Sequence, residues 1–305
     1  MHLTPLTVAD YSRFKHFFKH QRYPLCAYSL PSIIVWHNDE YHPLALVHDN
    51  SLVIGTEFKT QKQNRHLLLP VSPEKETPPE ALRDLALSLG YNRYWFVPGD
   101  YIDRFGKERV KACFTIAPHP EYDDYIYRQA DLADLSGNRY AKKRNLVNQF
   151  KRNFDMSKQI RIETATAADS DECAEFIEAW CLERQCDAGE QGDDLACEKI
   201  AALNAIWDID KLGINALLLR IDGEICAFGI GSYLTDDMGV LHFEKAFSRI
   251  KGLYQYFDSE CARRLFEGYR YINKESDMGE ANLARAKKSY HPVSMIRSYQ
   301  LVLRG

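Results

Sequence analysis

The stretch that decides the fold is residues 215–257, NALLLRIDGEICAFGIGSYLTDDMGVLHFEKAFSRIKGLYQYF. It contains three apolar runs of strand length, and turn sequences separate them. The first turn, Asp222-Gly223, is a strong signal for a two-residue hairpin. We therefore expect consecutive antiparallel strands at residues 215–221, 224–234 and 240–247, followed by a helix over residues 253–266.

The sequence on both sides extends this pattern into an α/β (α+β) half with a mixed, mostly antiparallel sheet. Helical periodicity and strand-length runs alternate there, and His291-Pro292 ends the last helix. The further elements that we expect are strands at 159–163, 270–273 and 295–303, helices at 172–183, 195–207 and 281–290, and a polar loop at 187–194.

The first half alternates short strands with turns, and it predicts a second mixed sheet. A long polar helix over residues 136–154 follows, which we expect near the junction of the two halves. We place the domain boundary at residue 155. Residues 1–155 then form the N-terminal half, which ends in the basic helix, and residues 156–305 the C-terminal half, which holds the candidate catalytic residues considered below. The strand candidates of the first half are residues 32–36, 43–47, 52–58, 66–71 and 94–97.

Composition excludes several classes of protein. Apolar residues make up 45% of the 305 residues and charged residues 27%, which is ordinary for a globular chain. The net charge of −4 gives the whole molecule no attraction to polyanions, so a polyanion site has to be local. There is no basic start followed by an apolar run, and no stretch of about 20 apolar residues. We expect a cytoplasmic protein without a transmembrane segment.

The cysteines do not indicate a metal site. None of the eight forms a C-x-x-C pair, and the four between Cys173 and Cys197 are 8, 5 and 11 residues apart, which matches no zinc pattern. We expect buried free thiols and no bound metal.

A basic cluster lies in the long polar helix. No acidic residue occurs between its first and last cationic positions. Such a cluster can bind RNA phosphate or a lipid headgroup, and a solvated helix face explains it equally well. The candidate polyanion-binding residues are Arg139, Lys142, Lys143, Arg144, Lys151 and Arg152.

The order of elements from residue 159 to residue 303 resembles the GNAT acetyltransferase fold. The segment Arg249-Ile250-Lys251-Gly252 is similar to the GNAT pyrophosphate loop, in which backbone N–H groups at a helix N-terminus reach phosphates. Arg249 and Gly252 are the positions that fit. Residues 282–290, NLARAKKSY, resemble the late GNAT helix that ends in a tyrosine.

The sequences of three segments resemble one branch of that superfamily more closely. DLADLSGNRYAKKRN at 131–145, HFEKA at 242–246 and SYHP at 289–292 resemble proteins grouped with the C-terminal domain of bacterial phosphatidylglycerol lysyltransferase. The resemblance covers nearly the whole chain. It implies two GNAT-like halves, related to the Fem-type peptidoglycan aminoacyltransferases. It also implies aminoacyl-tRNA or acyl-CoA as the donor with no tightly bound cofactor, and tRNA and an anionic lipid headgroup at the membrane surface as partners.

Acyl transfer needs a group that removes a proton from the acceptor and one that protonates the leaving group. His242 and Glu244 lie two apart on an expected strand, so we expect them on one face. By position in the GNAT-like pattern, Tyr290 is the general acid. A solvated or paired strand face, and a tyrosine at the core edge, explain these residues equally well. The expected substrate-binding residues are Lys245, Arg249, Gly252, Asn273 and Glu275.

The leading interpretation is an acyltransferase of the GNAT superfamily that transfers an aminoacyl group from aminoacyl-tRNA to a lipid or another amine or hydroxyl acceptor. Two alternatives stay open: an acyl-CoA-dependent N-acyltransferase, and a non-catalytic module that binds an anion or RNA.

Overall fold

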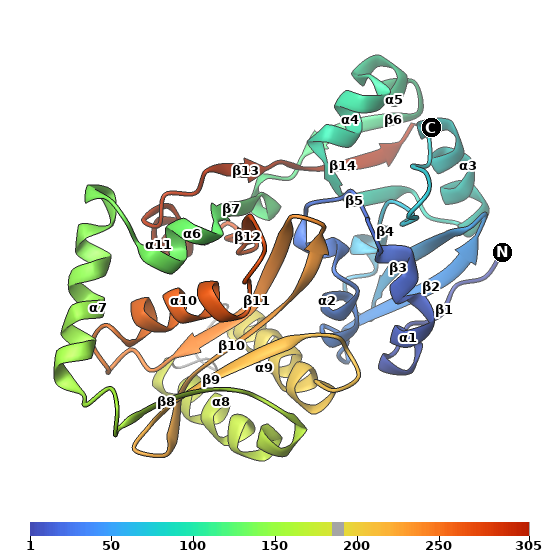
Figure 1. The fold of residues 1–305 in the computed structure, drawn as a ribbon. Coiled ribbons are helices and arrows are strands. Elements are labelled where there is room, and N and C mark those ends of the chain that lie inside the picture. Colours follow the sequence, from blue (N-terminus) through green and yellow to red (C-terminus); the bar gives the residue numbers. More distant parts are fainter. Residues whose placement is uncertain (185–191, 305) are drawn as a thin grey trace.

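The computed structural model describes residues 1–184 and 192–304, whose strands form two seven-stranded sheets (Figure 1). The first sheet has the order β1 (Thr4–Pro5), β2 (Tyr41–His48), β3 (Ser51–Phe58), β4 (His66–Leu67), β5 (Arg93–Pro98), β14 (Ser298–Leu303), β6 (Phe114–Pro118). The second has the order β8 (Ile160–Thr164), β9 (Asn215–Ile221), β10 (Glu224–Thr235), β11 (Met238–Ala246), β12 (Tyr271–Asn273), β7 (Asp124–Arg128), β13 (Ser294–Ile296).

The two sheets repeat one topology. In each, the first four strands are antiparallel neighbours, the fourth and fifth are parallel, and the last two are antiparallel again. The parallel pairs are β4 with β5 and β11 with β12. The fold-class prediction of two GNAT-like halves with mixed sheets is confirmed.

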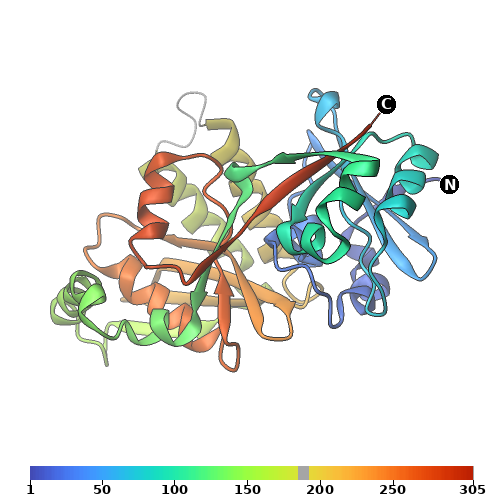
Figure 2. The same ribbon diagram turned by 90° about the horizontal axis from the view of Figure 1, so that it is seen from above.

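The sheets exchange their sixth strands. β14, from the end of the described chain, lies between β5 and β6 of the first sheet, and β7 lies between β12 and β13 of the second. Figure 2 shows the two connections crossing side by side from one sheet to the other. The predicted boundary at residue 155 lies between α7 (Ala141–Asn153) and β8. Because β7 and β14 are exchanged, the residues on each side of this boundary supply strands to both sheets.

Helices cover both sheets. α8 (Ser170–Arg184) and α9 (Gly192–Trp207) pack together beside the second sheet, and α10 (Leu253–Arg264) packs against its β9, β10 and β11. α7 packs on α10 at the side of the molecule remote from the first sheet, so the expectation of a basic helix near the junction is wrong (Figure 1). The remaining helices are α1 (Tyr11–Phe14), α2 (Leu30–Val35), α3 (Pro79–Leu89), α4 (Gly99–Phe105), α5 (Lys107–Cys113), α6 (Gln129–Asp134) and α11 (Ala281–Lys288).

The strands of the segment that decides the fold are confirmed within a few residues. Asp222 and Gly223 have φ values of 51° and 96°, the positive values that a two-residue hairpin of this kind requires. Gly90 caps α3 with a φ of 72°. Most of the polar loop expected at 187–194 lies outside the described residues, and its last positions belong to α9.

Four predicted elements differ from the structure. Residues 32–36 belong mostly to α2, because Ser29 accepts the backbone N–H of Ser32 as the N-cap and Pro31 stands in the first turn. The last strand is two strands, separated at Arg297 where the chain passes between the sheets. The strand expected at 66–71 is reduced to β4, and the helix expected at 136–154 begins as α7 at Ala141.

Candidate active site

The parallel strands β11 and β12 separate at the centre of the second half. They pair at Met238–Tyr271, Gly239–Ile272 and Val240–Asn273, and beyond that point β11 continues to Ala246 while β12 ends. Side chains fill the space where the strands part. Glu244 comes from β11, and Lys274 and Glu275 follow β12.

Lys274 is the centre of a buried ionic cluster. Its Nζ lies 2.9 Å from Glu244 Oε2 and 2.7 Å from Oδ1 of Asp258, which α10 supplies. The side chains of Glu244 and Asp258 are 4% and 2% exposed, so both carboxyls depend on this ammonium group. Within residues 1–184 and 192–304, Glu244 Oε1 and Asp258 Oδ2 have no hydrogen-bond partner.

Burial, reinforced by the neighbouring Asp258 carboxylate, raises the pKa of Glu244 to about 7. Burial by itself would lower the pKa of Lys274, but the carboxylates of Asp258 and Glu244 raise it well above its usual range. The cluster therefore contains a permanently charged ammonium beside a carboxyl that exchanges its proton near neutral pH.

Tyr290 lies beside the same cluster. The Lys274 Nζ is 5.4 Å from the centre of its ring, and the Lys143 Nζ of α7 is 3.8 Å from it. The Tyr290 hydroxyl is buried and has no hydrogen-bond partner in the part of the chain that the structure describes. Burial and the nearby Asp258 raise the pKa of Tyr290 well above its ordinary value. Glu244 and Tyr290 thus share Lys274 as a neighbour.

His242 belongs to a different set of contacts. Ile230 of β10 pairs with Phe243 and Gly231 pairs with Leu241, so His242 is the extra residue of a β-bulge. Because the bulge breaks the alternation of side chains, His242 turns away from α10, which Glu244 faces. Its Nε2 lies 2.8 Å from Ser232 Oγ and 3.3 Å from the Oγ of Ser29, the N-cap of α2. The expectation that His242 and Glu244 share one face is wrong for this reason.

Asn273 contacts the first half, and the neighbouring Glu275 contacts His242 within the second half. Glu275 Oε1 lies 3.1 Å from His242 Nδ1. Asn273 donates from Nδ2 to the carbonyl of Pro24, at 2.9 Å, and to Asp124 Oδ2, at 2.7 Å. Burial raises the pKa of Asp124 to about 6. The Asn273 contacts hold β12 against the first half, whereas Glu275 fixes the His242 ring.

The Gly252 end of the Arg249–Gly252 loop is covered, whereas Arg249 and Lys251 are exposed. Gly252 has a φ of 82°, and a Cβ atom there would lie 2.1 Å from the backbone oxygen of Leu146 in α7. Arg249 Nη1 is 2.5 Å from Glu183 Oε2, and Glu183 also accepts the backbone N–H of Ser248 at 2.6 Å. α7 and Glu183 therefore occupy the approach that a pyrophosphate would take to the N-terminus of α10.

Lys245 lies on the face of the sheet that α8 and α9 cover. It forms a buried ion pair with Glu198, and its Nζ is 4.3 Å from the centre of the Trp180 ring. An ammonium group enclosed between a carboxylate and an indole is a packing element, remote from the Lys274 cluster.

The basic helix divides into two groups of side chains. Arg144 Nη1 lies 2.5 Å from the carbonyls of Leu135 and Gly137, and Lys143 donates to Ser289 Oγ at 2.8 Å. These two residues hold α7 in place, and Arg139 is paired with Asp131 at 2.7 Å. The side chains that point to solvent are those of Lys142, Lys151 and Arg152.

The structure offers no metal centre in its described part. Among residues 1–184 and 192–304, no group of three or more His, Cys, Asp or Glu side chains is arranged to hold a metal ion. A cavity of about 850 Å³ lies in the first half and is not lined by Glu244 or Tyr290.

Comparison with known proteins identifies the family. The model of the family "Phosphatidylglycerol lysyltransferase, C-terminal" matches residues 17–302. The chain belongs to this family. A solved structure of a conserved protein of unknown function from Bacteroides thetaiotaomicron is 27% identical, covers 99% of both chains and has a TM-score of 0.87.

More distant structures share the fold of this family member. The C-terminal domain of a protein described as a lysylphosphatidylglycerol synthetase from Agrobacterium fabrum is 14% identical, covers 97% of this chain and 92% of its own, and has a TM-score of 0.64. FemX is 10% identical, covers 99% and 98%, and has a TM-score of 0.59. An uncharacterized protein of Mycoplasmoides gallisepticum is 24% identical over 193 residues, which span 63% of this chain and 60% of that protein.

Family and fold together support a function of the aminoacyltransferase type for this chain. No helix in residues 1–184 and 192–304 is long and apolar enough to cross a membrane. Sequence reasoning missed Lys274 and Asp258, the partners that give Glu244 its properties. The sequence carries only a weak signal for them. Lys274 comes directly after a short strand, and Asp258 lies in the buried part of α10.

Proposed function

We propose that the chain is an acyltransferase that takes an aminoacyl group from aminoacyl-tRNA and transfers it to an amine or hydroxyl acceptor, with lipids as one acceptor class. The observation that carries the proposal is Glu244. Its carboxyl is buried, Lys274 orients it, and its pKa of about 7 lets it accept a proton at neutral pH.

The chemistry needs two proton transfers. Glu244 takes a proton from the acceptor as the acceptor nitrogen or oxygen attacks the ester carbonyl and forms the new bond. The ester C–O bond to the ribose then breaks, and Tyr290 gives its proton to the departing alkoxide. Lys274 and Lys143 stand beside the tyrosine ring and stabilise the phenolate that remains.

Two observations favour aminoacyl-tRNA over acyl-CoA as the donor. A ribose alkoxide is a strongly basic leaving group and needs a proton donor such as the Tyr290 hydroxyl, whereas a thiolate leaves without such help. The covered Gly252 loop also leaves no open helix N-terminus for the CoA pyrophosphate. We propose that Lys142, Lys151 and Arg152, the exposed cations of α7, contact tRNA phosphates.

A non-catalytic module that binds RNA or another anion through α7 is the second candidate. The observation that favours it is that the side-chain oxygens of Glu244, Asp258 and Tyr290 that have no hydrogen-bond partner among the described residues are all buried. A buried group is closed to a substrate. Transfer by the purified chain would distinguish the two candidates, because a binding module retains tRNA affinity without forming product.

The experiment offers the chain tRNA charged with radiolabelled amino acids, together with a bacterial lipid extract and soluble amines. We expect labelled product, and we expect Glu244→Gln to lower turnover by about 10²–10⁴ while tRNA affinity changes less than about twofold. Glu224→Gln, an exposed position in the same sheet, is the matched control. Product from acyl-CoA alone, or full turnover by Glu244→Gln, would overturn the proposal.

A further inference from the structure

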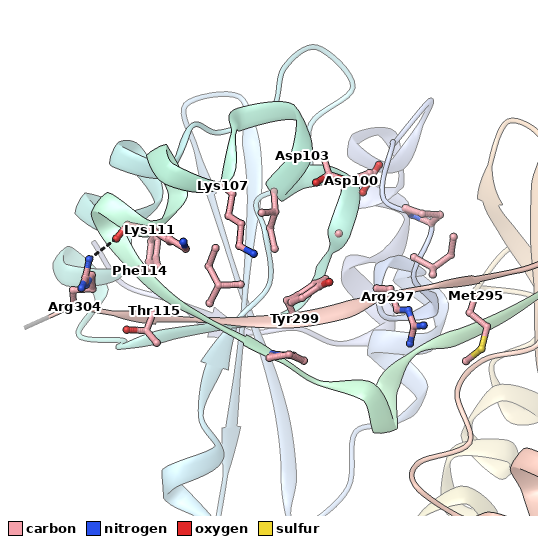
Figure 3. A pocket seen from close by; sticks show the side chains of 16 residues that line it. Asp100, Asp103, Lys107, Lys111, Phe114, Thr115, Met295, Arg297, Tyr299 and Arg304 are labelled. Carbon is pink, nitrogen blue, oxygen red and sulfur yellow. Dashed lines mark hydrogen bonds between the residues drawn. The ribbon is translucent and has the colours of Figure 1, made fainter.

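A cavity of about 850 Å³ lies in the first half, remote from the Lys274 cluster. Its walls are α4 and α5, and its floor is the pair of strands β14 and β6 (Figure 3). The exchanged strand β14 therefore supplies part of the floor. None of the residues that we place in the transfer reaction lines this cavity.

Cationic side chains gather at one end of the cavity. Lys107 and Lys111 come from α5, and Arg304 follows β14, so the three are drawn together from two distant parts of the chain (Figure 3). Arg304 donates through Nη1 to the backbone oxygen of Lys111 at 2.9 Å, which directs its guanidinium to this end. Within the described residues, Lys107 Nζ has no hydrogen bond or ion pair.

The other charged groups of the lining are already engaged or lie elsewhere. Arg297 is paired with Asp123 at 2.6 Å, and Asp100 is paired with Arg104 at 2.5 Å. Asp100 and Asp103 are at the end of the cavity remote from Arg304 (Figure 3). The end formed by Lys107, Lys111 and Arg304 thus keeps an excess of positive charge; Lys111 is partly compensated by Glu108 at 2.8 Å.

The middle of the cavity is apolar and aromatic. Phe114 and Ile116 come from β6, and Tyr299 from β14. A Cβ atom at Gly99 would lie 3.3 Å from the Tyr299 ring, so the glycine at the start of α4 lets this ring lie close to the helix. The apolar floor and the cationic end together match a ligand that has an apolar part and an anionic part.

We propose that this cavity binds a small amphipathic anion. A phosphate or carboxylate group lies against Lys107, Lys111 and Arg304, and an apolar or aromatic body lies on Ile116 and Tyr299. This ligand site is separate from the transfer reaction and does not depend on it. An alkyl phosphate of lipid type and an aryl or nucleoside phosphate share this chemistry, and the experiment distinguishes them.

The test is isothermal titration of the full chain at low salt with four probes: octyl phosphate, adenosine monophosphate, inorganic phosphate and octyl glucoside. We expect one of the two amphipathic phosphates to bind at least about tenfold more tightly than inorganic phosphate, and octyl glucoside not to bind. A preference for octyl phosphate indicates an alkyl body, and a preference for the nucleotide an aromatic one. Equal affinity for all phosphates, or no binding up to millimolar concentration, would overturn the proposal.

Variants locate the ligand. Lys107→Gln/Lys111→Gln/Arg304→Gln removes three charge-assisted contacts and should lower the affinity for the preferred ligand by at least about 30-fold. Lys59→Gln/Lys62→Gln/Lys75→Gln removes the same charge from exposed positions outside the cavity and should leave its affinity unchanged. Lys107→Glu, a single change at an exposed residue, replaces the triple variant if that variant unfolds. Unchanged affinity in Lys107→Glu, or equal losses in the two triple variants, would refute this location.

Discussion

The two halves share one sheet topology, but different side chains fill the space where their two parallel strands separate. In the first half the strands pair only at Leu67–Tyr94, and the space beside them holds aromatic rings, with His66 stacked on Trp95 at 4.3 Å. In the second half the corresponding space holds Glu244, Lys274 and Asp258. The same backbone frame therefore supports either a packed layer of rings or a buried cluster of carboxyls and an ammonium group.

The largest expected effect tests whether chemistry belongs to the second half alone. Tyr290→Phe removes the proposed acid and should lower turnover by about 10²-fold or more, with donor affinity unchanged. Tyr94→Phe removes a buried hydroxyl of the first half, which donates to the Leu82 carbonyl at 2.7 Å. That variant should lose about 1 kcal/mol of stability and keep its turnover. Equal kinetic losses in the two variants would remove the distinction between the halves.

The next effect concerns the buried ammonium. Lys274→Met leaves two buried carboxyls without their cation, which should lower the free energy of unfolding by about 3–5 kcal/mol in denaturant titrations. Lys274→Met/Asp258→Asn removes one of the opposing charges and should recover part of that loss. A single variant as stable as the wild type would mean that the cluster is solvated.

The halves should also respond to pH with opposite signs. The raised pKa of Glu244, about 7, means that the folded chain binds more protons than the unfolded one above pH 4.5, so its contribution to stability is lost as pH rises through 7. Burial lowers the pKa of His66 to about 3, so its contribution is present above pH 6.5 and is lost as pH falls through 3.

Each contribution is on the order of a few kcal/mol. Denaturant titrations between pH 4 and 8 should show the alkaline decline reduced in Glu244→Gln and the acid decline reduced in His66→Phe. A variant with the pH profile of the wild type would show that its group is not buried as described.

The smallest effect compares two glycines of positive φ. Gly252→Ala places a methyl group against the backbone of α7 and should cost about 2–3 kcal/mol. Gly90→Ala has a φ of 72° but nothing within 4 Å of the new atom, so it should cost about 1 kcal/mol. Equal costs would mean that α7 moves freely away from the Arg249–Gly252 loop.

The parts of the fold that local chemistry determines could be predicted from the sequence. Asp222-Gly223 and the alternation around it predict the hairpin. α2 was missed because its β-branched residues favour a strand while burial and the Ser29 cap favour a helix. The exchange of β7 and β14 joins segments far apart in sequence, and no local pattern encodes such a pairing.

The site was predictable only in part, for a similar reason. Glu244 and Tyr290 could be chosen by position, and both lie beside Lys274. The bulge at His242 changes which face the side chain occupies, and it depends on register with β10, which the sequence of β11 alone does not reveal. Whether these residues act in catalysis stays a prediction.

The exchanged strand has a consequence for synthesis on the ribosome. β5 and β6 of the first sheet have no strand between them until β14 arrives, about 180 residues after β6. At ordinary elongation rates this interval is roughly 10–40 s, during which two strand edges of a nascent domain stay open to other chains. The first half thus reaches its final form after the second, and a nascent chain stalled before residue 298 should require a chaperone to remain soluble.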